Sequence, residues 1–434
     1  MWSVKISPAK RIGGEIVLPG DKSISHRAIM LAAIADGESR ISNFATSEDC
    51  ASTIDCFRGL GIEIEHSGAD VRVDSKGKLG LSQPTRDLNC GNSGTTMRLM
   101  AGILAGQPFE SVLTGDESLQ SRPMKRVIDP LKAMGASIDS VDGKAPLTIH
   151  GRPLEAIRYE LPVASAQVKS CTLLAGLYAN GRTTVVESTP TRDHTERMLR
   201  GFGADVETTN TDDGRREISV GGAAQLHATD VSVPGDISSA AFFLVAAAGL
   251  KGSELRLAKV GINPTRAAII NVLKRLGARI MIENERESSG EPVADLIVRG
   301  GVDDSLESAH VLRGEVIANL IDEIPILAVF GTQLKSGLEV RDAGELRVKE
   351  SDRITSIVKN LKAMGAAIEE FDDGFRVGRS TLRGATVDSF GDHRIAMAFA
   401  VAGLFAEGET SLIDADCAAV SFPKFFDVLA EVAR

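Results

Sequence analysis

The sequence predicts an α/β protein of two similar domains, each built from three βαβαββ repeats. Three observations support this prediction. A short polar cluster followed by a long apolar helical run occurs six times. A Gly-centred motif that ends a helix and begins a strand occurs five times, out of phase with the first. The chain has 434 residues, which is long for a single core and typical of about two domains.

The six polar clusters are predicted to lie at helix starts. They occupy residues 20–23 (GDKS), 91–94 (GNSG), 164–167 (ASAQ), 234–237 (PGDI), 321–324 (IDEI) and 391–394 (GDHR). Between one marker residue of each cluster and the next, the steps are 70, 72, 71, 86 and 70 residues, which indicates a copied supersecondary unit. Free N–H groups and a partial positive charge make helix N-termini attractive to anions. If several of them converge, we expect a site for a multiply charged anion.

The second motif marks where a helix ends and a strand begins. It occurs at residues 60–62 (LGI), 134–136 (MGA), 202–204 (FGA), 276–278 (LGA) and 364–366 (MGA). Glycine often terminates helices, and the apolar period then changes from helical to alternating. The sixth copy is missing, because the chain ends on a helix at residues 425–432. An isolated strand at residues 2–6 is therefore predicted to complete the sixth repeat.

These repeats predict an inserted domain. Residues 1–16 and 229–434 are expected to form a discontinuous domain of three repeats, and residues 17–228 the other three. The chain then crosses twice, at the Gly-rich and polar segments 10–18 and 222–233. Two crossings make a hinge, and we expect the active site in the cleft between the domains. The polar segment 283–293 is predicted to be a loop insertion, which accounts for the long step of 86 residues.

Composition excludes several classes of function. A net charge of −10 argues against a general nucleic-acid binder. No apolar run is long enough for a membrane span, and the N-terminus has no targeting composition. Five cysteines without metal-type spacing indicate reduced thiols and a cytoplasmic location. Seven histidines show no ligand spacing, so no metal is expected.

Basic residues nevertheless gather at the clusters and the loops near them. Any one of them could be an ordinary solvated charge, but their recurrence in an acidic protein indicates a small anionic ligand. These residues are Lys22, Arg27, Arg98, Arg122, Lys169, Arg192, Lys349, Arg353 and Arg394.

Two segments carry the strongest local signals of chemistry. In the first, Lys22 and Ser23 stand at a helix start with Arg27 one turn later, which suits a phosphate or carboxylate. The spacing is not that of a P-loop, and His26 is interpreted as a packed or solvated histidine. In the second, Asp322 is embedded in an apolar run, where a carboxylate has either a structural partner or a functional task. The charged run 347–354 holds five charges in seven positions, and taken alone it is more typical of a salt-bridged, solvated turn.

Two longer motifs make the sequence similar to a known family. Residues 88–102 (LNCGNSGTTMRLMAG) and 347–357 (RVKESDRITSI) resemble both signatures of the 5-enolpyruvylshikimate-3-phosphate synthases. LPGDKSISHR, SAQVKS, IDEIP and GDHR occur in the order expected for that family. The resemblance covers essentially the whole chain. It implies an enolpyruvyl transferase fold, with helices inside and sheets outside in each domain.

The resemblance also implies a reaction without cofactor or metal. The enolpyruvyl group of phosphoenolpyruvate passes to the 5-hydroxyl of shikimate 3-phosphate through a tetrahedral intermediate, and phosphate is released. Asp322 is implied as the base near the 5-hydroxyl and Glu350 as the proton carrier at C3. Lys22 is implied to stabilise charge on the transferring group. The small-molecule substrates are the only expected partners, and the chain is expected to act as a monomer.

Binding residues follow from the resemblance, position by position. Those implied for shikimate 3-phosphate are Lys22, Ser23, Arg27, Ser165, Ala166, Gln167, Arg192, Asp322 and Lys349. Those implied for phosphoenolpyruvate are Lys22, Gly94, Arg122, Gln167, Arg353, His393 and Arg394. Inhibition by glyphosate, a competitor of phosphoenolpyruvate in this family, is expected. The chain departs from the commoner pattern at Leu99 and Val420, which border the phosphoenolpyruvate site in the family.

Two alternatives remain open at this point. A sister transferase that acts on UDP-N-acetylglucosamine has the same fold, but this chain has Glu117 where that family has a reactive cysteine, and Ser23 where it has Asn. A non-catalytic anion-binding repeat protein would need the glycines and the core. It would have no need for Asp322 and Glu350 together.

Overall fold

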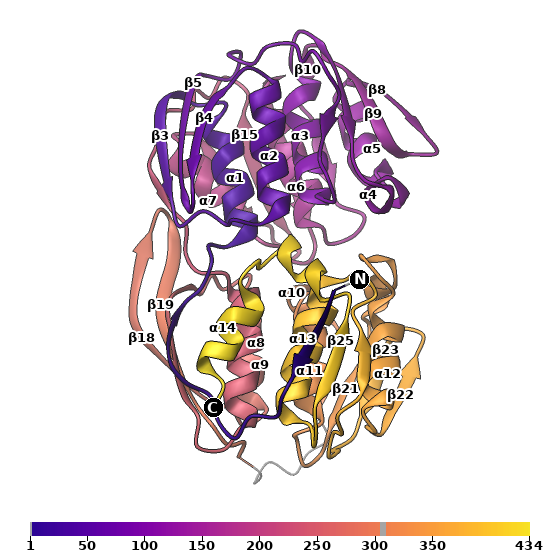
Figure 1. Ribbon diagram of the computed structural model, residues 1–434. Coiled ribbons are helices and arrows are strands. Elements are labelled where there is room, and N and C mark those ends of the chain that lie inside the picture. Colours follow the sequence, from indigo (N-terminus) through magenta and orange to yellow (C-terminus); the bar gives the residue numbers. More distant parts are fainter. Residues whose placement is uncertain (1, 304–309) are drawn as a thin grey trace. The chain divides into compact units, whose positions relative to one another are not determined.

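The structure is a computed structural model that describes residues 2–303 and 310–434 (Figure 1). The chain divides into two compact units. Unit 1 comprises residues 1–19, 234–287 and 292–434, and unit 2 comprises residues 20–233 and 288–291. The predicted boundaries after residues 16 and 228 lie a few residues before those of the units, which divide after Pro19 and after Val233.

Unit 2 contains the first three repeats. The first has α1 (Lys22–Ala32), β3 (Asp36–Ser42), α2 (Glu48–Gly59), β4 (Glu63–Ser67) and β5 (Asp70–Lys76). The second has β6 (Leu88–Asn89), α3 (Gly94–Ala105), β7 (Glu110–Thr114), α4 (Glu117–Ser121), α5 (Lys125–Ala133), β8 (Ser137–Val141) and β9 (Lys144–His150). The third has β10 (Leu154–Glu155), β11 (Arg158–Glu160), α6 (Ala166–Gly176), β12 (Ala179–Asn180), β13 (Arg182–Glu187), α7 (His194–Gly201), β14 (Val206–Asn210) and β15 (Arg216–Gly221). The short strand β16 (Val231–Ser232) follows.

Unit 1 contains the other three repeats and both termini. It begins with β1 (Ser3–Ile6) and β2 (Gly13–Val17). The fourth repeat has α8 (Ile237–Gly249), β17 (Glu254–Gly261), α9 (Ala268–Arg275), β18 (Arg279–Ser288) and β19 (Glu291–Arg299). The fifth has β20 (Val311–Leu312), α10 (Glu315–Leu320), α11 (Ile324–Gly331), β21 (Leu338–Val340), the 3-10 helix η1 (Gly344–Val348), α12 (Arg353–Ala363), β22 (Ile368–Phe371) and β23 (Gly374–Val377). The sixth has β24 (Thr386–Asp388), α13 (His393–Phe405), β25 (Thr410–Ile413), the 3-10 helix η2 (Ala415–Val420) and α14 (Phe425–Val432).

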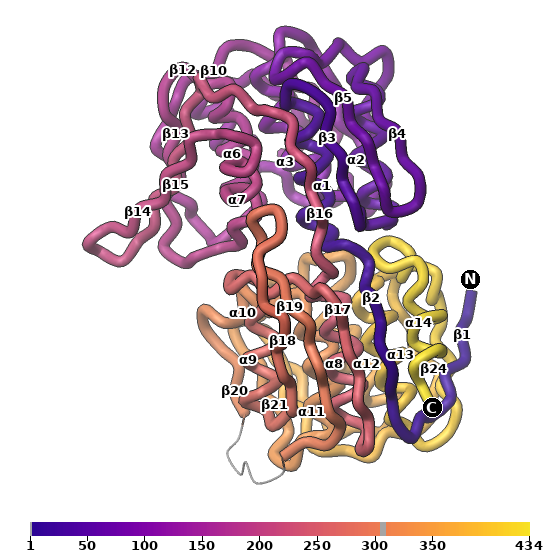
Figure 2. Tube along the Cα trace, turned by 90° about the vertical axis from the view of Figure 1, so that its left-hand side faces the viewer, coloured from indigo at the N-terminus to yellow at the C-terminus, as the bar shows by residue number. Residues whose placement is uncertain are grey.

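Each of the first five repeats supplies most of a four-stranded sheet with one topology. In the second repeat β6 lies parallel to β7 across α3, and β7 and β8 both pair antiparallel with β9. The first and fourth repeats exchange their first strands. β2 precedes α1 in the chain but pairs with β17, and β16 precedes α8 but pairs with β3 (Figure 2). Each of these two strands therefore belongs to the sheet of the unit that the chain is about to leave.

In each unit the helices are buried and the sheets have an exposed face. In α8 every residue from Ile237 to Ala248 is buried, so the helix is apolar all round. In β5 buried and exposed residues alternate, as in a sheet with one face toward water. Each unit has its own hydrophobic core cluster. The α/β class, the repeats and the arrangement with helices inside and sheets outside are confirmed.

The structure also settles the predictions for the chain ends and the crossings. β1 pairs antiparallel with β25, which confirms that the first strand completes the sixth repeat. Segments 10–18 and 222–233 are not simple linkers, because they contain β2 and β16. The prediction of a loop at residues 283–293 is wrong. These residues belong to β18, a two-residue turn and β19, which form an antiparallel hairpin whose first strand is mostly exposed and therefore polar.

Candidate active site

Five of the six polar clusters cap the helix that they begin. The side chains of Asp21, Ser93, Ser165, Asp236 and Asp392 each accept a hydrogen bond from a backbone N–H of the first turn. The cluster at residues 321–324 is the exception. α11 begins after Glu323 without a side-chain cap, and Asp322 lies in the turn before it. The carboxylate of Asp322 is directed to arginines instead of to a helix end.

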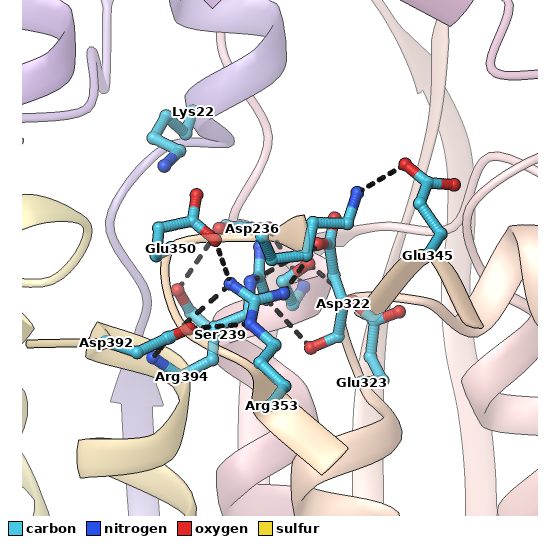
Figure 3. Close-up of polar contacts among 12 residues, drawn as sticks. Lys22, Asp236, Ser239, Asp322, Glu323, Glu345, Glu350, Arg353, Asp392 and Arg394 are labelled. Carbon is cyan, nitrogen blue, oxygen red and sulfur yellow. Dashed lines mark hydrogen bonds and ion pairs between the residues drawn. The ribbon is translucent and has the colours of Figure 1, made fainter. Parts of the chain in front are cut away.

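In unit 1, Arg353 is surrounded by three carboxylates (Figure 3). Its Nε lies 2.7 Å from Asp392 Oδ2, and its Nη2 lies 2.6 Å from Glu350 Oε2. Its Nη1 lies 3.5 Å from Asp322 Oδ1. Only 1% of the Arg353 side chain is exposed. Burial alone would lower the pKa of Arg353, but the three carboxylates together raise it above its ordinary value.

Arg394 ties the same group to the start of α13. Its Nε lies 3.5 Å from Asp322 Oδ1, and its Nη1 donates to the Asp322 carbonyl oxygen at 3.2 Å. Asp392 accepts from the Arg394 backbone N–H at 2.9 Å while it also binds Arg353. Asp322, Glu350, Arg353 and Arg394, four residues implied by the resemblance, are therefore brought together in unit 1. Lys349 is paired with Glu345 at 2.7 Å, and His393 is the buried first residue of α13.

In unit 2, α1 carries three of the residues implied for shikimate 3-phosphate, Lys22, Ser23 and Arg27. Lys22 Nζ lies 2.9 Å from Asp49 Oδ2, and the Ser23 carbonyl oxygen accepts from Arg27 Nη1 at 2.8 Å. Burial lowers the pKa of Arg27 to about 10, against the opposing effect of nearby acidic residues. The interpretation of His26 as a packed residue is confirmed, because it is fully buried and its Nδ1 lies 2.7 Å from Thr53 Oγ1.

Apart from Lys22 on α1, the residues implied for phosphoenolpyruvate in unit 2 lie around the start of α3. Arg122 Nη2 donates to Asn92 Oδ1 at 2.7 Å and to Ser118 Oγ at 3.1 Å. A Cβ on Gly94 would lie 2.9 Å from Arg98 Nη1 and 3.7 Å from Arg122 Nη1. The glycine thus allows both guanidinium groups close to the helix start.

Gln167 connects α6 to the same helix start. It accepts from Arg98 Nη1 at 2.6 Å and donates to Thr95 Oγ1 at 3.1 Å. Its neighbours Ser165 and Ala166 are the N-cap and the first residue of α6. Arg192 lies in the loop between β13 and α7.

One basic residue of the sequence analysis is not available to an anion. Lys169 is fully buried, with Nζ 2.7 Å from Glu196 Oε1 and 3.1 Å from Glu187 Oε2. Its charge is compensated inside unit 2, so the interpretation of Lys169 as part of a basic anion site is wrong. The two glutamates stand 18 and 27 residues further along the chain, so no local pattern indicated the pairing.

Sequence reasoning also missed the carboxylates that hold the cations. Asp49 pairs with Lys22, and Asp392 pairs with Arg353. A signal existed for Asp392, which is the acidic residue of the GDHR cluster. For Asp49, in the first turn of α2, the sequence gives only the ordinary preference of acidic residues for a helix start.

A family model described as EPSP synthase (3-phosphoshikimate 1-carboxyvinyltransferase) matches residues 6–429. The chain belongs to the EPSP synthase family. The 3-phosphoshikimate 1-carboxyvinyltransferase of Citrifermentans bemidjiense is 50% identical over 437 residues, with 100% of both chains covered. The same-named protein of Salinibacter ruber is 51% identical over 434 residues, with 99% of each covered.

Solved structures agree with this assignment. An EPSP synthase from Acinetobacter baumannii superposes with a TM-score of 0.88 and 43% identity, covering 99% of this chain and 98% of the other. The enolpyruvyl transferase NikO from Streptomyces tendae has a TM-score of 0.78 at 18% identity over 99% and 96% of the two chains, which shows a shared fold. Within the described residues, no helix is both long and apolar enough to cross a membrane.

The arrangement suits acid–base chemistry on an anionic substrate. In unit 1, two carboxylates that can move protons contact a guanidinium that can bind an anion. In unit 2, Lys22, Arg27 and Arg122 are held by side chains or backbone of the same unit.

Proposed function

We propose that the chain catalyses enolpyruvyl transfer from phosphoenolpyruvate to the 5-hydroxyl of shikimate 3-phosphate, with release of phosphate. The observation that carries the proposal is the contact of Asp322 and Glu350 with one buried arginine, Arg353. A non-catalytic anion-binding protein has no use for two carboxylates against its anion-binding cation. Membership of the EPSP synthase family supports the same reaction.

In this mechanism Asp322 takes the proton of the 5-hydroxyl. Its contacts with Arg353 and Arg394 stabilise the ionised form that a base requires. Lys22 stabilises negative charge on the transferring group as the tetrahedral intermediate forms. The reaction then eliminates phosphate, so one enol ether and one phosphate ion are formed for each pair of substrates.

Glu350 carries the proton to and from C3 of the enolpyruvyl group. In the structure it is paired with Arg353 at 2.6 Å. An anionic group of phosphoenolpyruvate that binds Arg353 competes for the same N–H groups. Glu350 then loses a strong ionic partner, so its protonated form becomes more accessible when the substrate is present. Substrate binding and the proton donor are thereby coupled through one arginine.

The residues of both units act on one pair of substrates, and the convergence of the two groups in a cleft stays a prediction. The enzyme needs no cofactor or metal and acts as a cytoplasmic monomer. All five cysteines are unpaired thiols, which fits a reducing compartment.

Steady-state phosphate release tests the function directly. We expect release from phosphoenolpyruvate only when shikimate 3-phosphate is present, with the enol ether detected by mass spectrometry in equal amount. The control replaces shikimate 3-phosphate with UDP-N-acetylglucosamine. Release with the nucleotide sugar alone would assign the chain to the sister reaction. No release with either acceptor would favour a protein that binds anions without turnover.

A further inference from the structure

Arg27 in unit 2 is held by three oxygen atoms from three places in the chain. Its Nη1 donates to the Ser23 carbonyl oxygen at 2.8 Å, its Nε to Thr195 Oγ1 at 2.6 Å and its Nη2 to Ser170 Oγ at 3.0 Å. Only 5% of the residue is exposed. A guanidinium has five N–H groups, so two of them remain for a ligand once these three bonds are made.

All three acceptors of Arg27 are neutral. Within the described residues, no carboxylate oxygen is recorded within 4.0 Å of its guanidinium, whereas Arg353 has three carboxylate neighbours. Burial lowers the pKa of Arg27 to about 10, so the group still carries its charge at neutral pH. Neutral acceptors fix the orientation of the guanidinium, and Glu196, Asp21 and Glu291 act on its charge only through space, without a direct ion pair. That charge is therefore available to an anionic ligand.

The two hydroxyl groups form a pair that connects two helices. Ser170 on α6 and Thr195 at the start of α7 lie 2.7 Å apart, oxygen to oxygen. Both residues are at most 1% exposed. One hydroxyl donates to the other while both accept from Arg27, so loss of either oxygen leaves a buried N–H of a charged group without its acceptor. Such a loss is costly, and the guanidinium can avoid it only by turning away from its present orientation.

We infer that Thr195 and Ser170 are positioning residues that orient Arg27 for shikimate 3-phosphate and thereby set the affinity of the enzyme for this substrate. The inference rests on the proposed function. Neither hydroxyl is required to touch a substrate, because both act through Arg27. The expected consequence is selective, since phosphoenolpyruvate is assigned to other residues.

The test is Thr195→Val, which keeps the shape of the side chain and removes its oxygen. We expect the KM for shikimate 3-phosphate to rise about tenfold, in line with the loss of a hydrogen bond to a charged group. We expect kcat and the KM for phosphoenolpyruvate to stay within about twofold, because the reacting groups are unchanged. Calorimetry with shikimate 3-phosphate alone should show the same loss of affinity. Thr195→Ser, which restores the hydroxyl, should return the KM to within about twofold of the wild type.

Thr172→Val is the matched control. Thr172 is also fully buried on α6, two residues from Ser170, and its hydroxyl donates to the Val168 carbonyl oxygen at 2.9 Å. It has no bond to Arg27, so this variant should leave the KM for shikimate 3-phosphate unchanged. Ser170→Ala is the second test variant if Thr195→Val does not fold, and it should reproduce the selective rise.

The outcomes separate the inference from the proposed function. No turnover by the wild type with both substrates would refute the function itself. An active wild type with an unchanged KM for shikimate 3-phosphate in the test variants would overturn the inference alone. Equal losses for both substrates, or the same loss in Thr172→Val, would also overturn it, because they would show a general effect on the fold.

Discussion

Gly94→Ala should separate inhibition by glyphosate from use of phosphoenolpyruvate. The added Cβ would lie 2.9 Å from Arg98 Nη1 and 3.5 Å from its Cζ. The end of an arginine side chain can move away by a few tenths of an ångström. Arg98 Nη1 also donates to Gln167 Oε1 at 2.6 Å, however, so such a movement would lengthen this hydrogen bond. The methyl group therefore acts in two ways, by occupying space at the helix start and by loosening the bond between Arg98 and Gln167.

The size of each effect follows from this geometry. Loosening one hydrogen bond of a charged group costs about 1 kcal/mol, so the KM for phosphoenolpyruvate should rise by about fivefold or less. Glyphosate is the longer molecule and meets the methyl group directly. A steric conflict of about 1–3 kcal/mol should raise its inhibition constant by a further tenfold or more. We therefore expect the ratio of inhibition constant to KM to increase by at least about tenfold.

Steady-state inhibition measured against phosphoenolpyruvate tests this prediction. Arg98→Lys with Gly94 retained is the control, because it weakens the bond to Gln167 without a methyl group at the helix start. It should raise the KM and leave the ratio nearly unchanged. A wild type indifferent to millimolar glyphosate, or an alanine variant with an unchanged ratio, would refute the reasoning.

Three further predictions concern other parts of the molecule. Asp322→Asn should lower kcat by about a hundredfold to ten-thousandfold, because Asn cannot accept the proton. The affinity for shikimate 3-phosphate, measured by calorimetry, should change only a few-fold. Near-normal turnover would exclude Asp322 as the base. Lys169→Met should lower the free energy of unfolding in urea by about 3–5 kcal/mol, because it removes the ammonium that lies 2.7 Å from buried Glu196 and 3.1 Å from buried Glu187, while Glu187 keeps Thr191 and Arg216 as partners. Lys132→Met, at an exposed position, should have little effect. The pKa of His26 lies well below 6.5 because of burial and two neighbouring cations, so the unfolded chain takes up this proton first. The free energy of unfolding should therefore fall by up to about 1.4 kcal/mol for each pH unit below pH 6.5. In urea unfolding measured at several pH values, His26→Asn should reduce this slope, and an unchanged slope would contradict the prediction.

The repeats and the helix starts could be predicted from the sequence because their signals are local. An Asp or Ser at a helix N-cap and a Gly at a helix end act within four or five residues of the chain. The exchange of β2 and β16 could not be predicted in this way. Its pairings join β2 to β17 and β16 to β3, which lie far apart in the sequence, and β16 has only two residues. Pairing between strands so far apart in the sequence produces no periodic pattern of apolar residues that would reveal it.

The β18–β19 hairpin was missed for a different physical reason. Over residues 283–287 every side chain of β18 is exposed. A strand with no buried face has no alternation of apolar and polar residues, so its sequence is typical of a loop. Its tip, Ser288–Glu291, belongs to unit 2 while its strands belong to unit 1. There His194 Nδ1 lies 2.8 Å from Glu291 Oε1, and both side chains are 2% exposed.

In the candidate site, too, some features could be predicted from short motifs, whereas others depend on residues far apart in the sequence. Family motifs indicated the reactive and binding residues, whose spacing within each motif is short. The partners that determine what each cation can do lie elsewhere in the chain. Lys169 stands in a polar helix start like the others, yet two distant glutamates compensate its charge. Only the folded structure distinguishes a cation held for a ligand from one held for the core.

Arg27 and Arg353 show why that distinction matters for the mechanism. Both are almost completely buried, and burial alone would lower the pKa of both. Arg27 is oriented by neutral oxygens, so an incoming anion meets a guanidinium without a direct ion-pair partner and displaces no carboxylate. Arg353 is paired with three carboxylates, so an incoming anion competes with them for its N–H groups. The first arrangement favours tight binding of one substrate before the reaction. In the second arrangement, part of the binding energy is used to release a carboxylate from Arg353. The carboxylate that lies 2.6 Å from Arg353 is Glu350, the group that must then carry the proton.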